Sequence, residues 1–205
     1  MTRLLIATTN PNKVREIREL LAGVPVELLG LDAFPSVTEP EETGDTFQAN
    51  ARLKAVYYAG AVAAQLRAAP ALVVAEDSGL EIDALDGEPG IRSARFLGAT
   101  ASYPERFAEI FRRLDARPGT PRTARFICAL TVVRDGEVVF ETQGTVEGEI
   151  AGAASGARGF GYDPIFFFPP YGRTLAEVDD EAKLRVAHRG HAFRQLGEWL
   201  KRSAG

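Results

Sequence analysis

The sequence predicts a mixed α/β fold with a long antiparallel portion. The chain opens with an apolar stretch, a polar turn, a stretch of helical periodicity and a second apolar stretch, which is the order of a βαβ unit. Two β-rich stretches later in the chain flank Asp135-Gly136, a dipeptide typical of tight hairpins. No internal repeat or Gly/Ser-rich linker interrupts the 205 residues, so we expect one domain over residues 1–205.

The opening unit has local signals for both its strands and its helix. A buried strand is predicted over residues 3–8, and a second one over residues 26–29. Between them, Asn10 is a favourable N-cap and Pro11 suits the first helical position. Gly23 is expected to end this helix. Its apolar face is expected to consist of Val14, Ile17, Leu20 and Leu21, with charged residues, Glu16 among them, in between.

The remaining elements follow from the same patterns of periodicity and turn residues. Further helices are predicted at residues 46–66, 104–114 and 188–202. Further strands are predicted at residues 71–75, 124–134 and 138–150. Loops and turns are predicted at residues 32–45, 76–79, 87–98 and 158–171.

Composition excludes several classes of protein. The 45% hydrophobic and 25% charged residues are ordinary for a globular domain and exclude a disordered, collagen-like or coiled-coil chain. With 24 basic and 28 acidic residues the net charge is −4, which argues against binding a nucleic-acid polymer but not a small anion. The single cysteine, Cys128, favours a reducing, cytoplasmic location. No apolar run approaches the length of a membrane span, so no membrane partner is expected.

A candidate phosphate-binding segment lies at the first predicted strand-to-helix junction. Free N–H groups at a helix N-terminus attract anions, and a lysine adds a full positive charge. The alternative is a capped helix with a solvated lysine. The residues of this segment are Thr8, Thr9, Asn10, Pro11, Asn12 and Lys13.

Two acidic segments could hold a metal ion. Glu41 and Glu42 precede a predicted helix on which Thr46, Asn50 and Lys54 share one face through their spacing of four. The alternative is an acidic first turn that favours the helix dipole, with a solvated face behind it.

The second acidic segment is Glu76-Asp77-Ser78-Gly79, which follows an apolar strand. Carboxylates at the end of a strand suit Mg²⁺, which takes oxygen ligands. The alternative is a plain turn, for which Asp-Ser-Gly is well suited.

Two further groups could recognise a nucleotide base. Glycines beside aromatic residues allow a flat ring to approach the backbone and stack, and an aspartate can accept hydrogen bonds from a base; these residues are Phe160, Gly161, Tyr162 and Asp163. Lys183, His188 and Arg189 could bind an anion or the edge of a base. The alternatives are a hydrophobic turn and a basic helix surface. Phosphate donors, acidic ligands, an aromatic slot and cations together fit a nucleoside triphosphate with Mg²⁺.

These motifs resemble the inosine/xanthosine triphosphate pyrophosphatase family. Six blocks match in family order across nearly the whole chain: residues 8–13, residues 41–47 with Asn50, Ala51 and Lys54, residues 76–80, residues 89–95, residues 159–164, and Lys183 with residues 188–190. The resemblance implies hydrolysis of ITP, dITP and XTP to the monophosphate and pyrophosphate, which clears deaminated purines from the nucleotide pool. It also implies Mg²⁺, a homodimer, and an elongated mixed sheet with flanking helices and two lobes around a central nucleotide cleft.

The resemblance also assigns roles. Thr8 to Lys13 would hold the triphosphate, Lys54 would face the phosphates, and Ser78 would contact the substrate. Asp77 would be the general base and a metal ligand, and Glu41 or Glu42 the other metal ligand. The base would be bound by Phe160, Gly161, Tyr162, Asp163, Lys183, His188 and Arg189.

Two departures and two alternatives accompany this assignment. Glu76 stands where bacterial members usually have Asp, and Ala187 where Ser is common; the first bears on metal geometry and the second on base binding. A pyrophosphatase for dUTP or a methylated nucleotide is the enzymatic alternative. A nucleotide-binding regulator without turnover is the other alternative.

Overall fold

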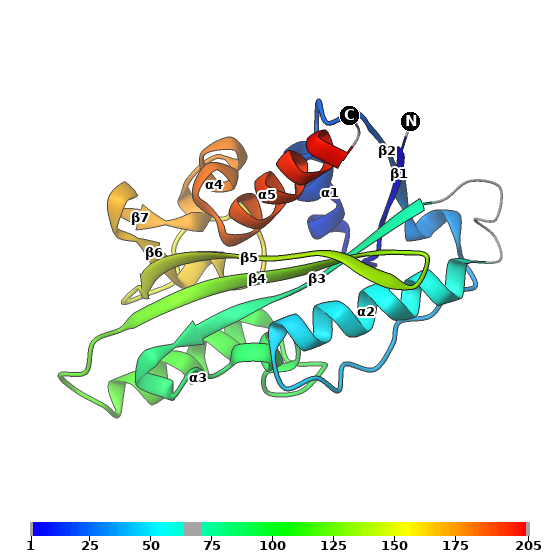
Figure 1. Cartoon of the computed structure of the whole chain (residues 1–205). Coiled ribbons are helices and arrows are strands. Elements are labelled where there is room, and N and C mark those ends of the chain that lie inside the picture. Colours follow the sequence, from blue (N-terminus) through cyan, green and yellow to red (C-terminus); the bar gives the residue numbers. More distant parts are fainter. Residues whose placement is uncertain (1, 64–70, 204–205) are drawn as a thin grey trace. The chain divides into compact units, whose positions relative to one another are not determined.

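In the computed structural model, which describes residues 2–63 and 71–203, seven strands form one mixed sheet in the order β2-β1-β3-β4-β5-β6-β7 (Figure 1). The strands are β1 Thr2–Ile6, β2 Val26–Gly30, β3 Ala71–Ile82, β4 Thr123–Arg134, β5 Glu137–Ile150, β6 Phe166–Phe168 and β7 Arg173–Thr174. The α-helices of the same residues are α1 Pro11–Leu20, α2 Phe47–Val62, α3 Tyr103–Asp115, α4 Asp180–Val186 and α5 His188–Ser203. The predicted α/β class is confirmed.

The chain divides into two compact units. The first unit consists of Met1–Asp77, Cys128–Gly144 and Arg189–Gly205, and the second of Ser78–Ile127 and Thr145–His188. Strands β3, β4 and β5 each contribute residues to both units. Each unit has its own hydrophobic core, and the two are described separately below.

The first unit opens with the predicted βαβ arrangement. Strand β1 pairs in parallel with β2, with Leu4 opposite Leu28, and in parallel with β3, with Leu4 opposite Leu72. Parallel strands need a crossover connection, which α1 supplies between β1 and β2. The prediction of strand, helix and strand over residues 3–29 is confirmed. The helix ends at Leu20, three residues before the glycine predicted to end it.

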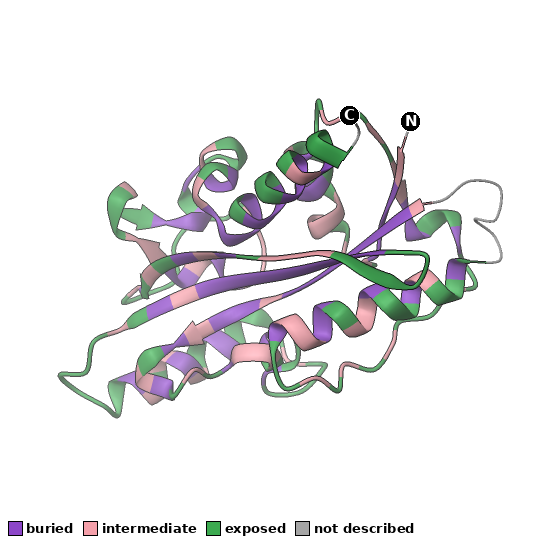
Figure 2. Cartoon of the chain, viewed as in Figure 1, coloured by how far each residue is buried: buried purple, intermediate pink, exposed green. Residues whose placement is uncertain are grey.

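Alternation along the strands of the first unit gives it two separate core faces. Figure 2 shows most of strand β3 as buried. Leu4 and Ile6 face one side and pack with residues of α1 and α5, while Leu5 and Ala7 face the other and pack with residues of α2. Strand β3 repeats the pattern, with Leu72 and Val74 on the first side and Val73 and Ala75 on the second. Figure 1 shows α2 on one side of these strands and α1 and α5 on the other.

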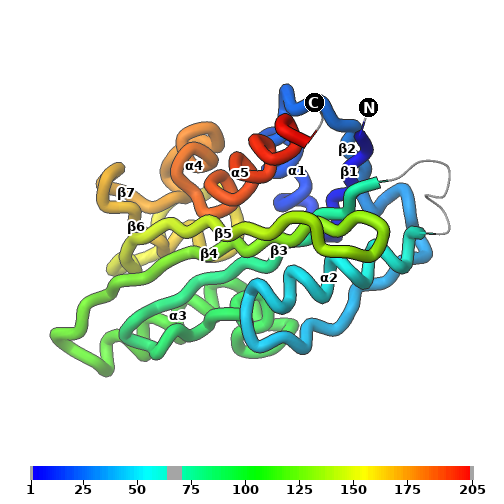
Figure 3. The backbone as a smooth tube through the Cα atoms, in the orientation of Figure 1, coloured from blue at the N-terminus to red at the C-terminus, as the bar shows by residue number. Residues whose placement is uncertain are grey.

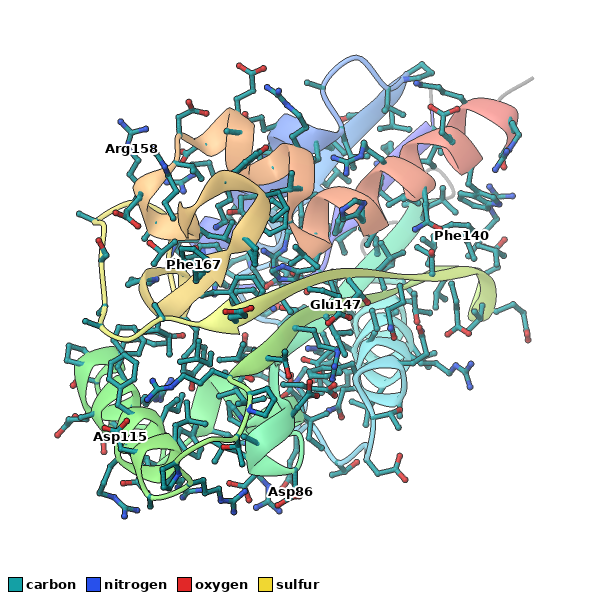
Figure 4. The ribbon with its side chains drawn as sticks, turned by 90° about the vertical axis from the view of Figure 1, so that its left-hand side faces the viewer. Asp86, Asp115, Phe140, Glu147, Arg158 and Phe167 are labelled. Atoms are coloured by element: carbon teal, nitrogen blue, oxygen red, sulfur yellow. The ribbon has the colours of Figure 1, made fainter. Side chains whose placement is uncertain are left out.

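Strands β4 and β5 form a long hairpin that reverses within the first unit (Figure 3). Its two turn residues, Asp135 and Gly136, both have positive φ (51° and 84°), as a type I′ turn requires. The hairpin prediction is confirmed. Phe140 on β5, labelled in Figure 4, stacks on Trp199 of α5 with ring centroids 5.1 Å apart.

The second unit packs α3 and the turn-rich segments around its own core. Helix α3 begins with a capping box between Ser102 and Glu105, and its apolar stripe includes Phe107 and Ile110. The short strands β6 and β7 continue the sheet in antiparallel pairing, with Ile150 of β5 opposite the first residue of β6. The helix predicted at residues 104–114 is confirmed, whereas α4 is an element that the sequence patterns do not predict.

Two predicted elements need correction. Strand β3 does not end at Ala75 but continues to Ile82, so the predicted turn at residues 76–79 is wrong. The predicted long helix begins at Phe47 with Thr46 as its N-cap, and its expected last residues, 64–66, lie outside the described residues. No helix of the described ranges is long and apolar enough to cross a membrane.

Candidate active site

The segment from Thr8 to Lys13, the candidate phosphate-binding segment, connects β1 to α1 in the first unit. The Asn10 side-chain oxygen accepts hydrogen bonds from the N–H groups of Asn12 (3.0 Å) and Lys13 (3.4 Å), and Pro11 occupies the first turn. Thr8 accepts from the Asn10 N–H, and the Thr9 hydroxyl donates to the carboxylate of Glu39. The predicted cap is confirmed.

Lys13 is not a solvated lysine. Its Nζ lies 3.4 Å from the Glu76 carboxylate, and its side chain is only 16% exposed. The lysine is therefore held at the start of α1, beside backbone N–H groups of the kind that attract anions. The alternative of a freely solvated side chain is wrong.

Glu76 and Asp77 are adjacent in β3, so their side chains point to opposite faces of the sheet. Glu76 belongs to the face covered by α1 and α5. Its Oε1 accepts a hydrogen bond from Arg189 Nε at 2.8 Å, and the buried Cys128 thiol donates to its Oε2. Arg189 also donates to Glu16 on α1 at 2.7 Å. This buried network links β3, α1 and α5.

Asp77 faces α2 instead. Lys54 Nζ donates to Asp77 Oδ1 at 2.9 Å and to Glu42 Oε1 at 2.7 Å. Asn50 Nδ2 donates to Asp77 Oδ2 at 3.3 Å, while its Oδ1 accepts from the Gly44 N–H at 2.8 Å. A Cβ at Gly44 would lie 2.7 Å from Asn50 Oδ1, so the absence of a side chain permits this approach. The predicted shared face of Asn50 and Lys54 on α2 is confirmed, and the structure shows that it brings both side chains to the Asp77 carboxylate.

The pKa values of Glu76 and Asp77 are shifted in opposite directions. Burial favours the neutral form of Glu76, but the charges of Arg189 and Lys13 outweigh burial and hold its pKa well below the ordinary value. Burial raises the pKa of Asp77, the Lys54 charge opposes this, and the Glu42 charge adds to it, so the pKa of Asp77 is raised. A more basic carboxylate accepts a proton from water more readily.

Lys54 remains a cation at this position. Burial alone would lower its pKa, but the charges of Asp77 and Glu42 outweigh burial and raise it. The lysine can therefore balance the two carboxylates and still offer positive charge to an anion nearby. The alternative of a solvated polar face on α2 is wrong, because Asn50 is fully buried and the Lys54 side chain is 13% exposed.

The donor set of this acidic site fits a hard divalent cation. Glu42 and Asp77 both contact the ammonium group of Lys54, whereas Glu41 is exposed. The structure therefore distinguishes Glu42 from Glu41, between which the sequence does not decide. Across residues 2–63 and 71–203, no three Asp, Glu, His or Cys side chains gather into a metal site. Two carboxylates are nevertheless the usual protein contribution to Mg²⁺, whose other ligands are waters and substrate phosphates.

The predicted base-binding motif forms a compact loop in the second unit. The Phe160 N–H donates to Asp163 Oδ2 at 2.8 Å, and Lys183 Nζ donates to the same oxygen at 2.6 Å. Lys183 Nζ also lies 4.7 Å from the centre of the Phe160 ring, a cation–π distance. Gly159 has φ +69°, and a Cβ there would collide with the Asp163 carboxylate. Lys183 is buried, so the alternative of a basic helix surface is wrong for this residue.

The other predicted base-binding residues are also buried. Tyr162 donates its hydroxyl to the Ser93 carbonyl at 2.8 Å. His188 stacks on Phe126 with ring centroids 4.9 Å apart. Ser78 is half-buried in β3, and Ala187 closes the C-terminal end of α4.

Sequence patterns miss two contributors to these clusters. Glu16 stands among the charged residues between the apolar positions of α1, yet it is 4% exposed and paired with Arg189. Arg106 of α3 is 3% exposed and lies in the second unit among aromatic side chains. A carboxylate beside the apolar Ile17 is the only local hint for the first; none exists for the second.

Comparison with known proteins identifies the family. The sequence profile of the Ham1 family matches residues 4–199. The chain belongs to the Ham1 family. Its fold agrees with two solved Ham1 structures: the HAM1 protein of Coxiella burnetii has a TM-score of 0.88 at 36% identity, covering 98% of this chain and 100% of that one. The Ham1 protein of Staphylococcus aureus has a TM-score of 0.82 at 34% identity, with the same coverage.

Several relatives of this chain have names that state an enzymatic activity. The chain is 44% identical over 200 residues to the dITP/XTP pyrophosphatase of Geobacter sulfurreducens, covering 98% of this chain and 97% of that one. It is 42% identical over 205 residues to the dITP/XTP pyrophosphatase of Geobacillus kaustophilus, covering 100% and 97%. The family resemblance drawn from the six motifs is confirmed.

Proposed function

We propose that this chain is a nucleoside triphosphate pyrophosphohydrolase that converts dITP, ITP and XTP to the monophosphate and pyrophosphate. Its Ham1 relatives named dITP/XTP pyrophosphatases support this substrate class. The observation that carries the chemistry is Asp77, a carboxylate of raised pKa fixed by Lys54 and Asn50 beside Glu42. Such a group is suited to accept a proton from an attacking water.

The proposed reaction is an in-line displacement at the α-phosphorus. Asp77 orients a water and takes its proton while the water oxygen bonds to the α-phosphorus. The bond from the α-phosphorus to the oxygen bridging to the β-phosphorus breaks, and pyrophosphate leaves with that electron pair. Lys54, Lys13 and the N–H groups at the start of α1 stabilise the negative charge on the phosphates. Glu42 and Asp77 would hold Mg²⁺, which supplies positive charge to the phosphates when bound.

Substrate recognition is proposed to use separate sets of residues for the triphosphate and for the base. Thr8 to Lys13 in the first unit hold the triphosphate. The loop from Phe160 to Asp163 accepts the purine ring, and Lys183, His188 and Arg189 contribute to binding the base. Arg189 also holds the Glu76 carboxylate. A site that donates to the 6-keto oxygen penalises adenine, whose amino group leaves a buried donor unpaired.

Product identification tests the reaction itself. Each of dITP, XTP, dATP, dGTP and dUTP is incubated with the enzyme and Mg²⁺, and the products are separated by ion-exchange chromatography. We expect monophosphate and pyrophosphate from dITP and XTP. Rapid turnover of dUTP alone would favour a dUTP pyrophosphatase. Tight binding of dITP without products would favour a nucleotide-binding regulator. Release of inorganic phosphate would exclude attack at the α-phosphorus.

The Asp77→Asn variant tests the assigned base. Loss of a general base lowers kcat by about 10²–10⁴ fold. Asp45→Asn is the matched control, because Asp45 is an exposed aspartate just before the same helix. Turnover of dITP by Asp77→Asn within about tenfold of wild type would remove Asp77 from this role.

The proposal extends to assembly and location. A homodimer is implied by the resemblance alone, and light scattering at a mass twice 22.1 kDa would support it. A cytoplasmic location is supported by the lone, buried thiol of Cys128, which makes no disulfide.

A further inference from the structure

Arg106 on α3 is an unusual residue for the interior of the second unit. Its side chain is among the buried groups at 3% exposure, and no carboxylate within the described part of the chain lies at ion-pair distance from its guanidinium. A buried arginine normally has a carboxylate partner, because an unpaired buried charge is costly. Here the Nε atom has no hydrogen-bond partner at all. Something other than a simple ion pair must account for this residue.

The contacts that Arg106 does make join two segments of the second unit. One terminal nitrogen donates to the Ser93 carbonyl at 3.4 Å, and the other donates to the Gly98 carbonyl at 3.2 Å. Both acceptors belong to the stretch that runs from the 3₁₀ helix Gly90–Arg95 into the following turn. The guanidinium carbon lies 5.0 Å from the centre of the Tyr103 ring, one turn earlier on α3. Arg106 thus connects α3 to that stretch through hydrogen bonds.

These same partners contact the loop proposed to receive the purine. Tyr162 donates its hydroxyl to the Ser93 carbonyl, the acceptor that Arg106 uses. The Tyr103 ring meets the Tyr162 ring edge to face, with centroids 5.4 Å apart. A Cβ added at Gly161 would lie 3.6 Å from the Tyr103 hydroxyl, so the ring of Tyr103 lies against the backbone of the loop.

Arg106 and Tyr103 therefore support one side of the loop, while Lys183 and Asp163 fix the other. In Figure 4, α3 is the helix that ends at the labelled Asp115. Gly161 within the loop and Gly159 just before it both have positive φ, so the backbone can change conformation unless its neighbours hold it.

We propose that Arg106, with Tyr103, is a positioning residue for purine recognition: it holds the Phe160–Asp163 loop in the conformation that accepts the base, without touching the phosphates. This inference rests on the proposed function. Its consequence is specific, because a residue that organises only the base subsite contributes to binding equally in the ground state and in the transition state. Losing it raises KM and leaves kcat in place.

The test is the Arg106→Met variant, which keeps an unbranched side chain as far as the position of Nε and removes the charge and the donors. We expect KM for dITP to rise about tenfold and kcat to stay within about threefold of wild type. Inorganic tripolyphosphate, which lacks a base, is tested as an inhibitor, and its inhibition constant should stay within about twofold of the wild-type value. Arg113→Met is the matched control, because Arg113 lies on the same helix with its guanidinium 5.2 Å from the Phe96 ring. It should leave KM unchanged.

A second variant covers the case in which Arg106→Met fails to fold. Tyr103 is 38% exposed, so Tyr103→Ala leaves the core intact, and we expect it to raise KM about threefold with kcat unchanged. Arg106→Lys should recover part of the wild-type KM, because it restores the charge and one donor. Wild-type turnover of dITP is measured first, so that failure of the proposed function is seen separately.

Three outcomes would overturn the proposal. KM for dITP could remain within about twofold of wild type in both variants. The fall in kcat could match the fall in kcat/KM, which would place the effect on the chemical step. The inhibition constant of tripolyphosphate could rise in step with KM, which would indicate a general loss of structure; where tripolyphosphate does not inhibit the wild type, the division between KM and kcat decides.

Discussion

Replacing Glu76 with Gln should destabilise the first unit far more than replacing an exposed glutamate. Glu76 and Arg189 have side chains only 2% exposed, and Lys13 adds a second positive charge at 3.4 Å from the same carboxylate. Removing one partner of a buried ion pair costs about 3–5 kcal/mol, because the remaining charge stays buried without compensation. Arg189 keeps its bond to Glu16, so we expect a loss near the lower figure, about 3 kcal/mol.

The assay is equilibrium unfolding in urea at pH 7, followed by circular dichroism and checked by a thermal melt. For a chain of this size, 3 kcal/mol corresponds to a fall in Tm of roughly 6–12 °C. Glu181→Gln is the control, because its pair with Arg185 is exposed at both ends. The control should lose less than about 0.5 kcal/mol.

The dependence of stability on acid pH supplies an independent check that the charged form of Glu76 stabilises the folded chain. The pKa of Glu76 is depressed in the folded chain, so its contribution is complete above the ordinary carboxyl pKa of 4.5. It is lost as pH falls below that value toward the folded pKa. The stability difference between wild type and Glu76→Gln should therefore stay constant from pH 7 to about pH 5 and then shrink. A difference below about 1 kcal/mol at pH 7, the range of exposed pairs, would refute the reasoning.

Three further predictions concern the candidate site. Lys54→Met should move the acid limb of the pH–rate profile for dITP to higher pH, because the cation that lowers the pKa of Asp77 is gone; an unmoved limb would separate the lysine from the base. Glu42→Gln should require more Mg²⁺ for half-maximal activity in a metal titration, whereas Glu41→Gln should titrate as wild type; equal behaviour would argue against Glu42 as the ligand. Asn10→Ala should lose about 1 kcal/mol in urea unfolding through loss of the N-cap, and a stability equal to wild type would contradict that role.

Local signals explain which parts of the fold could be predicted. The cap at Asn10, the hairpin at Asp135-Gly136 and the amphipathic stripe of α3 depend on neighbouring residues, and each is confirmed. Helix α4 has only seven residues, too few for a hydrophobic period to stand out from the surrounding turns.

Long-range charge explains what could not be predicted. An acidic pair beside Ser78-Gly79 is typical of a turn, because nothing near it in the sequence shows how a strand could bury two carboxylates. The compensating cations come from elsewhere: Arg189 is 113 residues from Glu76, and Lys54 is 23 residues from Asp77. The burial of Glu16 could not be predicted for the same reason, because its partner Arg189 is also distant in the sequence. The resemblance assigns roles to Asp77, Lys54 and Arg189 but none to Glu76 or Glu16, and it does not indicate which carboxylate faces which helix.

The back-to-back arrangement of Glu76 and Asp77 has a consequence for how sequences of this family change over time. Two residues joined by one peptide bond have different partners, so a change at position 76 alters the environment of Arg189 and Lys13 and leaves that of Asp77 largely as it was. Positions 76, 16 and 189 should therefore covary among relatives, while positions 76 and 77 should vary independently. Distance along the chain is then a poor guide to shared evolutionary constraint, and the face of the strand is a better one.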